Sequence, residues 1–149
     1  FNLGTTARTI NAPTFALVVL QTQNHTRFSF ASTNEPRRRG ARCLLTFQET
    51  ARPTIVRGAA GAALPSSGSF LIDPTTGRVE QSTFGVGGDA AGVASTSTVT
   101  YERDRTLGLW LPDEMREEYT TPGVERVTGV ATYSRYRRAD ISVRILPNQ

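Results

Sequence analysis

Apolar and polar side chains alternate with a period of two along much of this chain, and this alternation limits the choice of fold more than any other feature. In residues 26–31, Phe28 and Phe30 fall on one side of an extended backbone, while Arg27 and Ser29 fall on the other. A helix would need apolar residues three or four positions apart, so this spacing predicts a β-strand.

The same alternation, or an apolar run with turn residues at both ends, predicts further strands. These are residues 42–47, 54–58, 70–72, 78–84, 95–103, 115–120, 125–135 and 140–145. Pro112 has no backbone N–H to donate, so the segment that leads into residues 115–120 is predicted to be an edge strand or a bend. The stretch "PSSGS" at 65–69 is predicted to be a loop that leads into a strand.

One turn is specified by its own residues. Residues 70–72 and 78–84 flank the sequence "DPTTG" at 73–77. Pro74 fixes a φ suited to the second turn position, Asp73 is placed to accept a hydrogen bond from the turn backbone, and Gly77 takes positive φ without steric cost. These residues predict a β-hairpin.

One helix is predicted near the start of the chain, over Asn11–Gln21. Asn11 is a suitable N-cap, Pro13 fits the first turn, and residues 15–20 are all apolar. The β-branched pair Val18 and Val19 also suits a buried strand, so that alternative stays open.

The predicted elements add up to a mainly β fold. About seven to nine strands joined mostly by short turns predict a curved antiparallel sheet, a half-barrel meander, with the N-terminal helix over its concave face. The length of 149 residues and the apolar content of 38 % predict one domain, residues 1–149. The chain opens at Phe1, which is consistent with removal of a signal peptide or an upstream segment.

The charged residues limit the choice of partner. All 17 basic residues are arginines, and the formal net charge of +4 permits contact with nucleic acid or with anionic lipid head groups. The 13 acidic residues are interspersed with the arginines, and strand alternation divides Arg135 and Arg137 from Arg138. Nucleic acid is therefore disfavoured, a membrane surface stays open as a partner, and the oligomeric state is undetermined.

Few residues suit nucleophilic or metal-assisted catalysis. His25 and Cys43 are single residues of their kinds, and no serine lies in a G-x-S-x-G motif. Zinc sites need three or four ligands, so we expect no metal and no cofactor. Cys43 alternates with Leu44 and is interpreted as a buried structural thiol.

Glu114 and Glu118 are the candidate catalytic residues of a glycoside hydrolase, which needs two carboxylates about 5–10 Å apart. In an extended strand they share a face but lie about 13 Å apart, so one of them needs a partner on another strand. The candidate partners are Glu49, Glu80 and Glu102, and the candidate sugar-stacking platforms are Trp110 and Tyr119. Solvated charges on an outer face are the alternative explanation.

Three stretches of the chain carry a resemblance to known sequences. They are "NLGTTARTINAPTFALVVLQTQNHTRFSF", "ARPTIVRGAAGAALPSSGSFLIDPTTGRVEQSTF" and "STVTYERDRTLGLWLPDEMREEY" running on to "GVATYSRYRR". They resemble a family of uncharacterised bacterial proteins, common in Acidobacteria, that has no assigned activity. The strand plan and the ending "ATYSRYRRADISV" are similar to the outer-membrane lipoprotein carriers. That resemblance implies a helix-lidded half-barrel that shelters acyl chains, and export to the periplasm or beyond.

The first functional prediction is an exported, non-enzymatic binding protein that holds an acyl chain, a lipid or a lipoprotein in its concave face. The residues predicted to bind the ligand are Phe28, Phe30, Phe47, Tyr101, Trp110, Arg135 and Arg137. The alternative is a small glycoside hydrolase. A third reading is an assembly module that joins a partner chain through its sheet edges.

Overall fold

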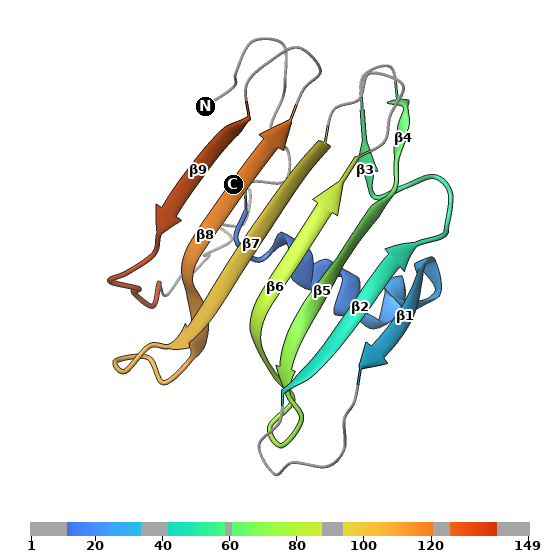
Figure 1. Ribbon diagram of the computed structural model, residues 1–149. Coiled ribbons are helices and arrows are strands. Elements are labelled where there is room, and N and C mark those ends of the chain that lie inside the picture. Colours follow the sequence, from blue (N-terminus) through green and yellow to red (C-terminus); the bar gives the residue numbers. More distant parts are fainter. Residues whose placement is uncertain (1–11, 34–41, 59–60, 88–93, 121–125, 140–149) are drawn as a thin grey trace, which may run out of the picture.

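The computed structural model describes residues 12–33, 42–58, 61–87, 94–120 and 126–139. Within these ranges the chain forms one antiparallel sheet of seven strands, in the order β1-β2-β5-β6-β7-β8-β9, and a separate pair β3-β4 (Figure 1). The strands are β1 (Phe28–Thr33), β2 (Cys43–Glu49), β3 (Val56–Arg57), β4 (Ala63–Leu64), β5 (Ser66–Asp73), β6 (Arg78–Val86), β7 (Ala94–Arg103), β8 (Trp110–Thr120) and β9 (Val127–Thr132). The predicted mainly β meander is confirmed, and the sheet stays open instead of closing into a barrel.

A short 3₁₀ helix, η1 (Phe15–Leu20), lies within the range predicted to be helical, and a second one, η2 (Thr22–Arg27), follows beyond it. Both pack behind the sheet in Figure 1. Thr14 at the start of η1 makes no side-chain capping bond, and Asn11 lies outside the described residues. Helix η2 runs through Arg27, so the first strand begins at Phe28 and not at residue 26. None of the helices in the described ranges has the length and apolar content needed to cross a membrane.

The hairpin between β5 and β6 is confirmed in detail. The Asp73 carboxylate accepts hydrogen bonds from the Thr75 N–H and the Thr76 hydroxyl, both at 2.9 Å. Gly77 has φ of +71° and donates its N–H to the Asp73 carbonyl at 2.8 Å. The bond from the Thr75 N–H is the largest cause of a pKa of Asp73 below its ordinary value.

Two details of the predicted strands are wrong. The stretch 65–69 is not a loop, because β5 already begins at Ser66 and pairs with both β2 and β6. The last described strand ends at Thr132, so residues 133–135 do not continue it, and Arg135 has a left-handed φ of 57°. Strand alternation therefore does not place the side chains beyond Thr132. The predicted strand 140–145 lies outside the described residues.

Pro112 produces a bend but not an edge. Strand β8 lies between β7 and β9, and its pairing with β7 shifts by one residue at Asp113. The pairing with β9 begins only at Glu114, so Pro112 has no ladder partner on that side to which an N–H would have to donate.

The two faces of the sheet differ in chemistry. The inner face, under η1 and η2, carries the largest buried side chains: Phe28, Phe47, Phe70, Phe84, Val99, Tyr101 and Met115. The outer face carries short hydroxylated side chains, and one row across four strands is Thr46, Ser69, Thr83 and Thr98. The apolar side of the alternation thus faces the helices, as expected for a sheet with one covered face.

Gly68→Ala is expected to lower the free energy of unfolding by about 3 kcal/mol or more. A Cβ atom at Gly68 would overlap the Thr83 carbonyl and lie 2.8 Å from Cζ of Phe47. Gly85→Ala is the matched control, because its added Cβ would have no neighbour closer than 3.5 Å. Urea unfolding followed by circular dichroism measures both variants, and equal losses would contradict the close approach at Gly68.

Candidate functional site

Aromatic rings gather on the inner face around Phe47. The Phe47 ring stacks on Phe70 with centroids 5.2 Å apart, meets Phe28 edge-on at 5.7 Å and lies 6.0 Å from Phe84. Phe15 of η1 meets Phe84 edge-on at 5.2 Å. These five rings are called the aromatic cluster, and they form an apolar surface that four strands and one helix share.

Residues 12–26 are called the lid. Helix η1 covers the four strand rings of this cluster and contributes the fifth, Phe15, whereas no residue of η2 is buried. Every residue of η1 is apolar, and Val19 is completely buried against the sheet. Within the described ranges, the one hydrogen bond from the lid to the sheet, apart from the turn that leads into β1, runs from the Tyr101 hydroxyl to the Pro13 carbonyl at 3.1 Å. The Tyr101 oxygen also lies 2.9 Å from the Ser82 hydroxyl. Apolar contact therefore holds the lid in place, with a single polar tie.

The chain is fixed much more firmly where the lid ends. The Arg27 carbonyl accepts the N–H groups of Thr50 and Ala51 at 2.8 and 3.2 Å. The Arg27 guanidinium donates to the Pro53 carbonyl and to Glu49, whose side chain is fully buried.

Glu49 in turn accepts hydrogen bonds from the Ile55 N–H at 2.8 Å and the Ser66 hydroxyl at 2.9 Å. A buried carboxylate is retained only where donors surround it, and these donors come from three segments of the chain. Arg27 and Glu49 thus anchor the end of the lid to β1, β2 and β5.

The structure brings together only part of the predicted ligand-binding set. Phe28 and Phe47 are in contact on the inner face, and Phe30 lies beside Phe28 on the edge strand with 38 % of its surface exposed. Tyr101 lies on the same face but in a second buried cluster, with Val99 and Met115. Trp110 lies at the far end of β8, where its indole N–H donates to the Val79 carbonyl at 2.7 Å. Arg135 and Arg137 are exposed beyond β9 and do not border the cluster.

Three members of the cluster were not predicted as ligand-binding residues. Phe70 and Phe84 were assigned correctly to a hairpin, but the face that they occupy depends on the register between β5, β6 and their neighbours. Phe15 was placed in a helix whose contact with the sheet the sequence does not define. If the strand had been predicted to begin at Ser66, strict alternation would have placed Phe70 on the same face of the sheet as Ser66 and Gly68.

Glu114 and Glu118 lie on the outer face of β8, on either side of Arg116. Glu114 forms an ion pair with Arg116 at 2.7 Å, and Glu118 forms one with Arg126 at 2.5 Å. Glu102 lies two residues beyond Thr100, the partner of Glu114 on β7, which makes these carboxylates diagonal neighbours. Of the three candidate partners, Glu49 is buried on the inner face and Glu80 pairs with Arg42, so Glu102 is the one placed near Glu114.

Two hollows in the described part of the chain lie away from the aromatic cluster. One of about 390 Å³ lies on the outer face of β7 to β9 and includes Thr98, Arg116 and Arg126 in its lining. The other, of about 210 Å³, lies where β7 and β8 are joined and includes Arg103 and Arg135. Phe70 and Phe84 are completely buried, so solvent does not reach the centre of the cluster while the lid is closed.

The free energy of unfolding is expected to fall more steeply above about pH 10 in the natural protein than in Tyr101→Phe. Burial raises the pKa of Tyr101, opposed by its bond to Ser82, so the folded state prefers the neutral phenol. This stabilisation is complete below the unfolded pKa of about 10 and is lost as the pH rises through the folded pKa. Urea unfolding across this range measures the difference, and parallel pH profiles would contradict it.

No family model, no curated protein and no solved structure matches this chain. The resemblance to bacterial lipoprotein carriers, and the export that it implies, therefore stay predictions. The candidate site is defined by its geometry: an aromatic sheet face beneath the apolar helix η1, with one hydrogen bond from the sheet to the lid among the described residues outside the turn into β1.

Proposed function

We propose that the protein binds an apolar ligand, such as an acyl chain, on the inner face of the sheet after the lid moves away. The observation that supports this proposal most is the chemistry of the lid contact. Helix η1 presents only hydrocarbon and aromatic groups to the cluster, with Ala16 and Val19 buried against it. An acyl chain would replace these groups with others of the same polarity, so the sheet would lose little apolar burial in the exchange.

The uneven attachment of the lid also supports its displacement. Arg27 is held by bonds to Glu49, Thr50, Ala51 and Pro53, whereas residues 12–26 have, within the described ranges and outside the turn into β1, the single tie from Tyr101. Movement about Arg27 would release the lid without breaking the hydrogen bonds between the strands. The 3₁₀ form of both helices has poorer hydrogen-bond geometry than an α-helix, which lowers the cost of reshaping them.

Ligand affinity in this mechanism depends on how often the lid is open. The apparent dissociation constant equals the intrinsic constant divided by the open fraction. A change that weakens only the closed lid should therefore raise affinity, which no change in a permanent core would do.

Tyr101→Phe is expected to strengthen binding of a dansyl-labelled fatty acid about five-fold. The substitution removes the hydrogen bond to Pro13, worth about 1 kcal/mol, and leaves the ring in place. Fluorescence titration measures the affinity. Tyr136→Phe is the matched control, because the Tyr136 hydroxyl donates to the Pro112 carbonyl, away from the lid. Absence of binding to the natural protein, or equal affinities in all three proteins, would show that the inner face is only a core.

A glycoside hydrolase is the second candidate, and the strand register is the observation that favours it. Diagonal neighbours on adjacent strands lie roughly 7–8 Å apart between Cα atoms, which suits a pair of catalytic carboxylates. Glu102 and Glu114 have this relationship on the outer face. Glu114 is already paired with Arg116, however, and neither carboxylate is buried in the apolar setting that keeps a catalytic acid protonated.

If the second candidate holds, the protein hydrolyses chromogenic glycosides, and both Glu102→Gln and Glu114→Gln reduce turnover at least a hundred-fold, as loss of a general acid or base does. Glu118→Gln should keep most of the activity, since its partner is Arg126. Turnover that survives both substitutions would remove this pair from consideration.

A further inference from the structure

The turn that joins β7 to β8 holds a leucine in solvent. Leu109 has 56 % of its surface exposed, one of the highest values among large apolar residues in the described ranges. The turn around it is rigid: the Asp104 carboxylate accepts the N–H groups of Thr106 and Leu107 at 2.9 and 2.7 Å. Backbone bonds from Asp104 to Leu109 at 2.8 Å, and from Gly108 to Asp104 at 2.9 Å, close it.

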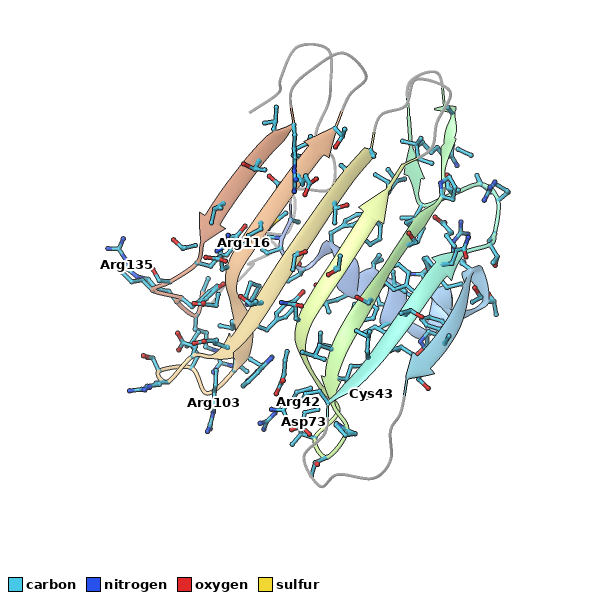
Figure 2. The ribbon with its side chains drawn as sticks, in the orientation of Figure 1. Arg42, Cys43, Asp73, Arg103, Arg116 and Arg135 are labelled. Carbon is cyan, nitrogen blue, oxygen red and sulfur yellow. The ribbon has the colours of Figure 1, made fainter. Side chains whose placement is uncertain are left out.

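Arginines without carboxylate partners surround this turn. In the described part of the chain, no carboxylate lies within ion-pair distance of Arg103, Arg105 or Arg135, and all three line the hollow at this end of the sheet. Figure 2 shows the Arg103 side chain at the lower end of the sheet, directed downward, and the Arg135 side chain at the left beside the end of β9, directed outward. These guanidinium groups are therefore available to bind anions.

Trp110 follows Leu109 in the chain, and its ring packs against the buried cluster of Val99, Tyr101 and Met115. The Arg78 guanidinium lies 5.5 Å from the centre of this ring. Arg135 and Arg137 flank Tyr136, whose hydroxyl donates to the Pro112 carbonyl at 2.6 Å. An apolar tip, a tryptophan and a ring of arginines is the combination that binds the interface of a bilayer.

We propose that this end of the sheet docks on the surface of an anionic lipid bilayer, with Leu109 inserted among the acyl chains and the arginines on the head-group phosphates. Charge complementarity supports this occupant. Six arginines of the described ranges lie at this end, Arg42, Arg78, Arg103, Arg105, Arg135 and Arg137, with five carboxylates, Asp73, Glu80, Glu102, Asp104 and Asp113. Glu80 is paired with Arg42, and Asp73 is bound by the residues of its own turn. Asp104 is moreover bound by the backbone of its own turn. The proposal concerns a different part of the molecule from the lid and does not depend on it.

Vesicle flotation and the fluorescence of the single tryptophan test this docking. The protein should float with phosphatidylcholine vesicles that contain phosphatidylglycerol, should bind less as salt rises, and should show Trp110 quenching by brominated lipid. Leu109→Ser should weaken binding about ten-fold, and the double variant Arg103→Gln/Arg105→Gln about thirty-fold.

Matched controls separate this site from general charge and hydrophobicity. Val130→Ser removes an equally exposed apolar residue from the outer face of β9, and Arg52→Gln/Arg57→Gln removes two exposed charges near the opposite end of the sheet. Both controls should bind as the natural protein does.

Failure to float, or an equal loss in the controls, overturns the proposal. If inorganic phosphate fully prevents vesicle binding, the arginines bind a soluble anion. If labelled single-stranded DNA binds more tightly than the vesicles and displaces them, the arginines bind nucleic acid. Either outcome also rejects the bilayer, whereas fatty-acid binding by the lid variants would be unaffected.

Discussion

The packing of the Phe47 ring is the contact on which both the sheet and its cover depend. One side chain from β2 touches Phe28 on β1, Phe70 on β5 and Phe84 on β6. Aromatic pairs of this kind each contribute about 0.5–1.5 kcal/mol beyond the area that they bury. The ring also lies directly over Gly68, where the backbone of β5 leaves room for it. Without this contact, the strands on either side of β2 would have no common apolar centre.

The same rings serve as the core of the closed protein and as the surface of the proposed site. This double role is possible because the hydrophobic effect has no direction and does not distinguish a helix from an acyl chain. Ala16 and Val19 of the lid are buried in the cluster, and Phe15, Leu17, Val18 and Leu20 pack against it. The Tyr101 bond adds about 1 kcal/mol to this apolar contact. A ligand that competes with the lid therefore has to restore most of the apolar burial that the lid provides.

The parts of the fold that the sequence predicted are those governed by neighbouring residues. The turn at 73–77 was predicted because Asp73, Pro74 and Gly77 act within five positions of one another. The register between strands was not predictable, since the shift at Asp113 depends on β7, β8 and β9 together. This register determines which carboxylate lies near Glu114. The lid was predicted as one helix and not as two 3₁₀ segments, because the sequence does not show how Phe15 meets Phe84 of the sheet.

The difference in hydrogen bonding before and after Arg27 affects how the protein unfolds. The strand ladder and the Arg27–Glu49 anchor share hydrogen bonds with one another, whereas the lid has almost none in common with them. Regions that share few bonds lose structure as separate cooperative units. Residues 12–26 are therefore joined to the strands by a shared apolar cluster and, in the described ranges, one hydrogen bond outside the turn into β1, so the apolar surface that their separation exposes sets the cost of opening.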